Sequence, residues 1–166
     1  MPVGAWCTGV GLENREIGDV EEFEPSAGQL LRRRAHEVGD RPFVRCGGPW
    51  VSYAEMDEAS SRVAGAMAEM GVQHGDRVIV LSANSTDMIE VVFGCSKVGA
   101  VLVPVNTYLR GDLLRHQLTD ADATVAFVDE AGLATIRLFE PEVVFRTVVL
   151  LGENMQPNPG VVTLAS

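Results

Sequence analysis

Apolar residues recur at steps of three and four in two long stretches near the start of the chain. The spacing of Leu30, Leu31, Ala35 and Val38 predicts a helix over 26–38 that ends at Gly39. A second helix is predicted from Ser52 to Gly71, and its apolar face consists of Tyr53, Met56, Ala59, Val63, Met67 and Met70. Ser52 and Glu55 have the spacing of a capping box, which fixes where this helix begins.

Short runs of β-branched and other apolar residues follow, separated by helical stretches. Strands are predicted at 77–81, 100–105, 124–128 and 146–151. Helices are predicted between them: from a cap at Asn84-Ser85 to Val98, over 112–118, and over 130–139. This alternation indicates βαβ units, so the fold class is α/β with a parallel sheet buried on both faces.

The remaining segments complete the predicted organisation. Residues 42–46 and 50–51 form a small antiparallel hairpin that turns at Gly47-Gly48. Residues 1–24 are interpreted as an acidic, poorly ordered leader, 25–152 as one partial domain, and 153–166 as a loop.

Charge and composition narrow the classes of partner. The net charge is −10, of which residues 1–24 carry −5 through six acids and one arginine. An acidic surface repels phosphate backbones, so no nucleic-acid partner is expected. The basic run Arg32-Arg33-Arg34 is interpreted as a solvated helix face. The longest uncharged apolar stretch, 98–105, is too short for a transmembrane segment, and a cytoplasmic protein is expected.

The cysteines and histidines do not form a recognisable metal or disulfide pattern. Cys7, Cys46 and Cys95 share no short spacing, and the three histidines are equally scattered. We therefore expect reduced thiols and no metal site.

Five short motifs, in order, resemble the adenylate-forming (AMP-binding) enzymes. The first is a strand with an S-Y-x-E-M helix start, at Arg41–Phe43 with Trp50–Met56. The second is G-V-x-x-G-D-R-V at Gly71–Val78, and the third is an N-S cap at Asn84-Ser85, in which Ala83 replaces the family's usual proline. The last two are K-V-G-A-V at Lys97–Val101 and P-V-N at Pro104–Asn106. The resemblance implies a partial N-terminal domain of that fold, covering residues 41 to about 151.

Within the family, Asn106-Thr107 with the following Arg110 to Leu118 is similar to acyl-CoA synthetases, including fatty-acid ligases. The resemblance implies a parent that joins a carboxylic acid to ATP and passes the acyl group to coenzyme A, with magnesium as cofactor. In the family, the phosphate loop and the catalytic lysine come later in the chain. The chain is therefore interpreted as an N-terminal fragment that has no catalytic residues of its own, is inactive alone and is prone to self-association.

Individual residues are interpreted against this background. Lys97 is expected to complement the dipole at a helix end, Gly99 to be left-handed, Pro104 to end a strand, and Asn106 to form an Asx turn. Arg110 and His116 are candidate contacts for coenzyme A, because they follow the carboxyl end of a predicted parallel strand.

Three alternatives stay open at this point. One is an adenylation domain that feeds a carrier protein, although such domains in peptide synthetases usually carry an aspartate at the position of Asn106. Another is a non-catalytic interaction module built on the same fold. A flavodoxin-like protein would need a glycine-containing phosphate loop after the first parallel strand, where 81–85 has none.

Overall fold

A computed structural model describes residues 26–139, 142–152 and 161–163 of the chain. Its centre is a five-stranded sheet in the order β4-β3-β5-β6-β7, in which all neighbouring strands run parallel. The α/β class and the parallel sheet predicted from the sequence are confirmed. The strands are β3 (Arg77–Leu81), β4 (Val101–Pro104), β5 (Val125–Val128), β6 (Thr147–Leu150) and β7 (Val161–Thr163).

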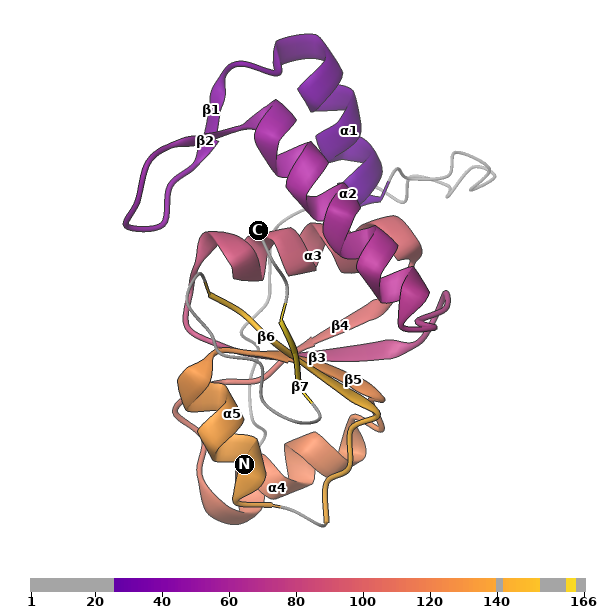
Figure 1. The fold of residues 1–166 in the computed structure, drawn as a ribbon, viewed down its shortest axis with the longest axis vertical. Helices are drawn as coiled ribbons and strands as arrows, with labels where there is room; N and C mark the ends of the chain where they lie inside the picture. Colours follow the sequence, from indigo (N-terminus) through magenta and orange to yellow (C-terminus); the bar gives the residue numbers. More distant parts are fainter. Residues whose placement is uncertain (1–25, 140–141, 153–160, 164–166) are drawn as a thin grey trace, which may run out of the picture.

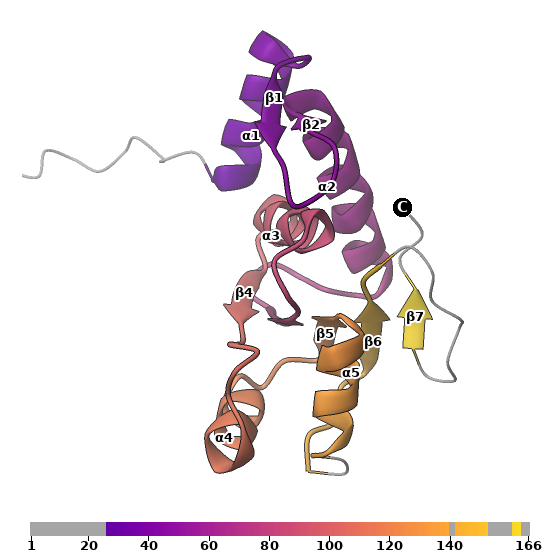
Figure 2. The same cartoon turned by 90° about the vertical axis from the view of Figure 1, so that its left-hand side faces the viewer.

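Helices cover both faces of this sheet. On one face lie α2 (Tyr53–Glu69) and α3 (Thr86–Val98), with α1 (Ala27–Val38) packed against these two helices farther from the sheet (Figure 1). On the other face lie α4 (Gly111–Asp120) and α5 (Glu130–Arg137). The antiparallel hairpin of β1 (Pro42–Val44) and β2 (Val51–Ser52) lies with α1 and α2 at one end of the long axis, as Figure 2 also shows. The predicted hairpin and helices are therefore confirmed, with slightly different bounds.

Alternation along the central strands creates two separate cores. In β3, Val78 and Val80 pack toward α2 and α3, whereas Ile79 and Leu81 pack toward α4 and α5. In β5, Phe127 belongs to the first core and Val128 to the second, and all of Val125–Val128 is buried. Side chains that point alternately to opposite faces explain why such strands contain only apolar residues.

Side-chain caps define where the helices begin. Ser52 Oγ accepts from Glu55 N (3.2 Å) while Ser52 N donates to Glu55 Oε2 (2.7 Å), the predicted capping box. Ser26 forms a second box with Gln29, a pairing that its S-x-x-Q spacing would also have indicated. Ser85 caps α3, and Gly99 ends it in the left-handed region at φ 75°, as predicted.

Two predictions about the strands were wrong. The run 100–105 was expected to be a buried strand, but β4 is an edge strand: Val101 and Pro104 are exposed, and Leu102 and Val103 are only half-buried. Residues 161–163, which fall in the segment predicted as a loop, form β7 and extend the sheet beyond β6.

The predicted leader 1–24 lies outside the described residues. Within the described ranges, no helix has both the length and the apolarity needed to span a bilayer.

Candidate functional site

The carboxyl ends of the parallel strands meet at one edge of the sheet, and polar residues follow them. β3 and β5 lie side by side, with Leu81 paired to Val128 at their ends. After β3 the chain enters α3 on one face, and after β5 it enters α5 on the opposite face (Figure 1). Such a switch point is where open parallel sheets usually bind ligands.

In this protein the switch point is bridged by the carboxylate of Asp129. Its Oδ2 accepts from the backbone N of Ala83 (2.8 Å), and its Oδ1 accepts from the backbone N of Gly132 (2.7 Å). A Cβ at Gly132 would lie 2.1 Å from the carbonyl oxygen of Leu81, so the start of α5 lies directly against the end of β3. Asp129 thus engages two of the backbone amides at this point, those of Ala83 and Gly132, which an anion at the start of a helix could otherwise use.

Asp129 was not singled out in the sequence, although a signal was present. An aspartate directly before a helical stretch is a favoured N-cap, and it accepts here from Gly132, three residues later. Its second contact, to Ala83, joins residues 46 positions apart and has no local sequence signature.

The segment between β4 and α4 contains Asn106 and Arg110, the first of the two residues predicted as ligand contacts. Asn106 Oδ1 accepts from Tyr108 N (2.9 Å), which confirms the predicted Asx turn. One Arg110 nitrogen donates to the carbonyl oxygens of Thr107 (2.5 Å) and Leu109 (2.6 Å), so part of this guanidinium holds its own loop in place.

His116 lies further along α4 and is exposed, as is Arg110. Within the described ranges, no hydrogen bond or ion pair joins these two side chains. The structure places both after the carboxyl end of β4, as expected, but does not assemble them into one site.

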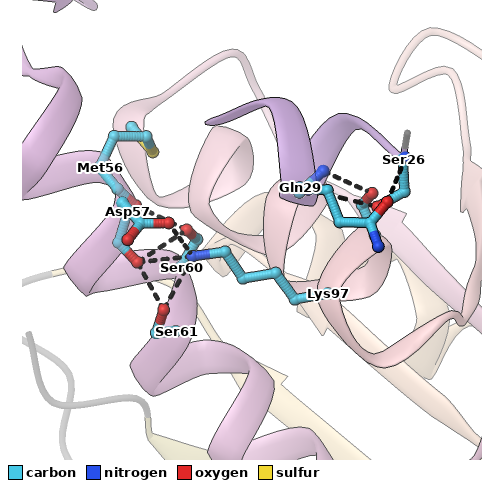
Figure 3. Close-up of polar contacts among 9 residues, drawn as sticks. Ser26, Gln29, Met56, Asp57, Ser60, Ser61 and Lys97 are labelled. Atoms are coloured by element: carbon cyan, nitrogen blue, oxygen red, sulfur yellow. Dashed lines mark hydrogen bonds and ion pairs between the residues drawn. The ribbon is translucent and has the colours of Figure 1, made fainter. Parts of the chain in front are cut away.

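Lys97 forms a buried polar cluster between α3 and α2 (Figure 3). Its Nζ lies 2.6 Å from the Asp57 carbonyl oxygen, 2.7 Å from Asp57 Oδ1 and 2.8 Å from Ser61 Oγ, and its side chain is 5% exposed. These three acceptors match the three donors of an ammonium group. Lys97 is therefore structural, as predicted, but it acts through a cross-helix ion pair in addition to its position at the helix end.

Other ionisable groups in the described part of the chain offer little chemistry. Burial raises the pKa of the Cys95 thiol to about 12, so this cysteine is not a nucleophile at neutral pH. Burial, followed by the neighbouring Asp87 carboxylate, raises the pKa of Glu90. Within the described ranges, no three His, Cys, Asp or Glu side chains lie close enough to hold a metal ion. Cys7 lies outside these ranges.

Comparison with known proteins identifies the family. The family model described as AMP-binding enzyme matches residues 31–161, which is more than half of the chain. The fatty acid–[acyl-carrier-protein] ligase ScoC of Streptomyces coeruleorubidus is 37% identical over 114 residues, which cover 68% of this chain and 22% of that protein. The 2-succinylbenzoate–CoA ligase of Oceanobacillus iheyensis is 36% identical over 106 residues, which cover 63% of this chain and 22% of that protein.

Solved structures agree with this result. A fatty acyl CoA synthetase of Mycobacterium tuberculosis matches with a TM-score of 0.70 and 25% identity, covering 76% of this chain and 26% of the other. The N-terminal domain of FACL13, also from Mycobacterium tuberculosis, has the same fold, with a TM-score of 0.67 and 23% identity over 85% of this chain and 34% of the other. The chain thus spans about a fifth to a third of these relatives, and it belongs to the AMP-binding enzyme family.

Proposed function

We propose that this chain is the N-terminal part of an acyl-CoA synthetase whose substrate is a carboxylic acid, most simply a fatty acid. The observation that carries the proposal is the five-motif pattern on this fold, in a chain whose relatives include acid–CoA ligases. In the proposed reaction, a carboxylate oxygen attacks the α-phosphate of ATP and releases pyrophosphate. The thiol of coenzyme A then attacks the acyl carbon of the acyl-adenylate and releases AMP.

We further propose that the 166 residues do not catalyse this reaction alone. Activation of a triphosphate needs backbone amides around the phosphates, a magnesium ion and a nearby cation. The described residues do not fit an Mg–ATP group, because they contain no metal-binding cluster and Lys97 is already fully engaged. The Asp129 carboxylate also engages the amides of Ala83 and Gly132 at the switch point.

The role proposed for this segment in coenzyme A binding rests on Arg110 and His116. Both are exposed, Arg110 at the end of the loop that follows β4 and His116 within α4. Arg110 has guanidinium donors beyond the nitrogen that holds Thr107 and Leu109. In an enzyme that contains this segment, Arg110→Ala and His116→Ala should raise KM for coenzyme A while leaving pyrophosphate exchange unchanged. A change in exchange and an unchanged KM would contradict this role.

The direct test of the whole proposal is ATP–pyrophosphate exchange with the purified chain and a panel of short to long acids. No exchange is expected. Exchange above background would show that the chain itself holds a complete adenylation site.

Sequencing the DNA beyond codon 166 should show, within a few dozen codons, a Ser/Thr/Gly-rich segment that ends in Pro-Lys.

A second candidate is an adenylation domain that loads a carrier protein. The similarity to the fatty acid–[acyl-carrier-protein] ligase ScoC and to Surfactin synthase subunit 2 of Bacillus subtilis favours it. In an extended protein, the acyl acceptor decides between the two: thioester formation with coenzyme A supports the synthetase, and formation only with a carrier protein supports the alternative.

A non-catalytic interaction module remains the third candidate, and the state of the chain in solution tests it. Large apolar side chains are exposed on the α4 and α5 side, namely Tyr108 (87%), Leu113 (71%), Leu138 (78%) and Val144 (77%). We expect them to cause self-association of the isolated chain, since apolar surface of this kind is normally covered. A monodisperse monomer with sharp, cooperative unfolding and no binding of a hydrophobic dye would favour the module.

A further inference from the structure

The loop that leaves the end of β3 is bound to the start of α5 by a single carboxylate. Asp129 Oδ2 accepts from the backbone N of Ala83 at 2.8 Å, and Asp129 Oδ1 accepts from the backbone N of Gly132 at 2.7 Å. The first bond reaches loop 82–85, which leads into α3, and the second is the N-cap bond of α5. The two oxygens of one side chain therefore bind two different elements.

These two elements lead to opposite faces of the sheet. β3 and β5 run parallel and end side by side, with Leu81 paired to Val128. After them the chain enters α3 on one face and α5 on the other (Figure 1). Asp129 thus connects the segments that begin these two helices, around the carboxyl edge of the sheet.

The amide donor at position 83 exists because this residue is not proline. Proline has no backbone N–H, and the N-S cap motif of the related enzymes usually has proline at the position of Ala83. A chain with proline here would keep the N-cap bond from Gly132 but could not form the bond between the loop and Asp129. The departure from the motif at Ala83 therefore supplies the amide that Asp129 binds.

The other contacts of this loop are local. Ala83 and Asn84 are exposed, so apolar packing does little to fix their position. Ser82 Oγ donates to the carbonyl oxygen of Ala83 at 3.1 Å, and Ser85 caps α3. The bond from Ala83 to Asp129 instead joins residues 46 positions apart, and a hydrogen bond to an ionised carboxylate is stronger than one between neutral groups. This bond is thus well placed to control the loop.

We propose that Ala83 and Asp129 form a latch that makes loop 82–85 and the first turn of α5 open and close as one unit. Opening of the loop removes one of the two donors that orient the carboxylate, and the Asp129 side chain can then rotate away from Gly132 as well. Fraying of α5 in turn moves the acceptor away from Ala83. The latch is a conformational device of the sheet edge, and this inference does not depend on the proposed function.

The test follows amide hydrogen exchange by NMR in the full 166-residue chain. Ala83→Pro removes the loop donor and leaves both partners of the bond between Asp129 and Gly132 in place. If the two segments open together, exchange at the Gly132 amide should accelerate about tenfold, which corresponds to about 1.4 kcal/mol. The matched control Ala83→Ser keeps the backbone N–H and should leave exchange at Gly132 unchanged.

Asp129→Ser tests the same latch from the side of the acceptor. Serine is a favoured N-cap residue, but its single oxygen cannot serve both amides. Exchange should accelerate about tenfold at Ala83 and at Gly132 together. Ala83→Pro added to Asp129→Ser should have no further effect at Gly132, because the bond that proline removes is already absent.

Several results would overturn the proposal. If Gly132 exchanges equally fast in Ala83→Pro and in the unaltered chain, or if Asp129→Ser accelerates exchange at Ala83 alone, the loop and α5 open independently. If Ala83→Ser has the same effect as Ala83→Pro, or if Ala83→Pro has its full effect in the Asp129→Ser background, the amide donor is not the cause. Exchange at Phe127, which is fully buried in β5, should stay unchanged. Equal acceleration at Phe127 and Gly132 would show global unfolding in place of a local latch.

Discussion

The two helical layers that cover the sheet are held in different ways. On the side of α1, α2 and α3, polar contacts join helix to helix: Lys97 binds Asp57 and Ser61 on α2, and Ser96 Oγ accepts from Gly28 N on α1 (2.8 Å). On the other side, α4 and α5 pack onto the sheet through buried leucine and isoleucine side chains, namely Leu114, Leu118, Leu133 and Ile136.

The difference matters because substitutions affect the stability of buried polar contacts and of apolar packing in different ways. Removing one partner of a buried ion pair leaves the other charge without compensation, which costs more than the pair contributes. Apolar packing responds instead to volume, whether a cavity is opened or an atom is forced in. The α1–α3 layer should therefore be sensitive to single polar changes, and the α4–α5 layer to changes of size.

The largest effect is expected from a substitution that breaks the ion pair between Lys97 and Asp57. Lys97→Met should lower the free energy of unfolding by about 3–5 kcal/mol, because it leaves the Asp57 carboxylate, 22% exposed, without its cation. Urea unfolding followed by circular dichroism measures the loss. The double variant Lys97→Met/Asp57→Leu should recover a large part of it, and a double variant as unstable as Lys97→Met would show that the pair itself stabilises the fold.

The next largest effect is expected at Gly132, where α5 lies against the end of β3. Gly132→Ala should lower stability by about 3 kcal/mol, the upper end for overpacking, since the new Cβ meets the rigid carbonyl of Leu81. Gly65→Ala on α2 is the matched control, because nothing lies within 4 Å of its added Cβ. The control should gain up to about 1 kcal/mol through helix propensity. Equal effects of the two variants would contradict the packing argument.

A smaller effect is expected from the carboxylate that bridges β3 and α5. Asp129→Ala should cost about 2 kcal/mol, the upper end for an N-cap, because it also releases the Ala83 amide. Hydrogen exchange should accelerate at the amides of Ala83 and Gly132. Asp129→Asn keeps one acceptor oxygen and should lose less. If exchange changes only at Gly132, the link to Ala83 is not formed in solution.

The smallest effect tests the capping box that begins α2. Ser52→Ala should cost about 1 kcal/mol. The hydrogen bond from the Ser52 backbone lowers the pKa of Glu55, so the contribution of Glu55 is present at neutral pH and is lost as pH falls through the folded-state pKa. Glu55→Gln should therefore flatten the acid side of the stability profile. A profile unchanged by this substitution would mean that the carboxylate does not cap the helix.

Local signals in the sequence predicted most of this fold. Ser52 with Glu55, Ser85 and Gly99 act within one turn of a helix, and each was placed correctly. The edge position of β4 could not be obtained in this way. Its apolar run resembles that of β5, and only the order of strands in the sheet decides which one is covered.

Contacts between distant segments were the other limit. The sequence identified Lys97 as structural because it lies at a helix end, but its partners lie 36 and 40 positions away. The candidate site was predicted only as a region. Arg110 and His116 follow β4 as expected. The bridge that Asp129 forms at the switch point could not be predicted, because it depends on how closely α5 approaches the end of β3.

The adjacent positions of Ser96 and Lys97 restrict how the length of α3 can change. Ser96 is held by α1 and Lys97 by α2, and consecutive helical residues point about 100° apart. One residue inserted between Ser85 and Ser96 would rotate both side chains by about the same angle and disconnect both helices at once. We therefore expect an insertion or deletion in this part of the chain to be tolerated in the loops beside α3 and not within the helix itself.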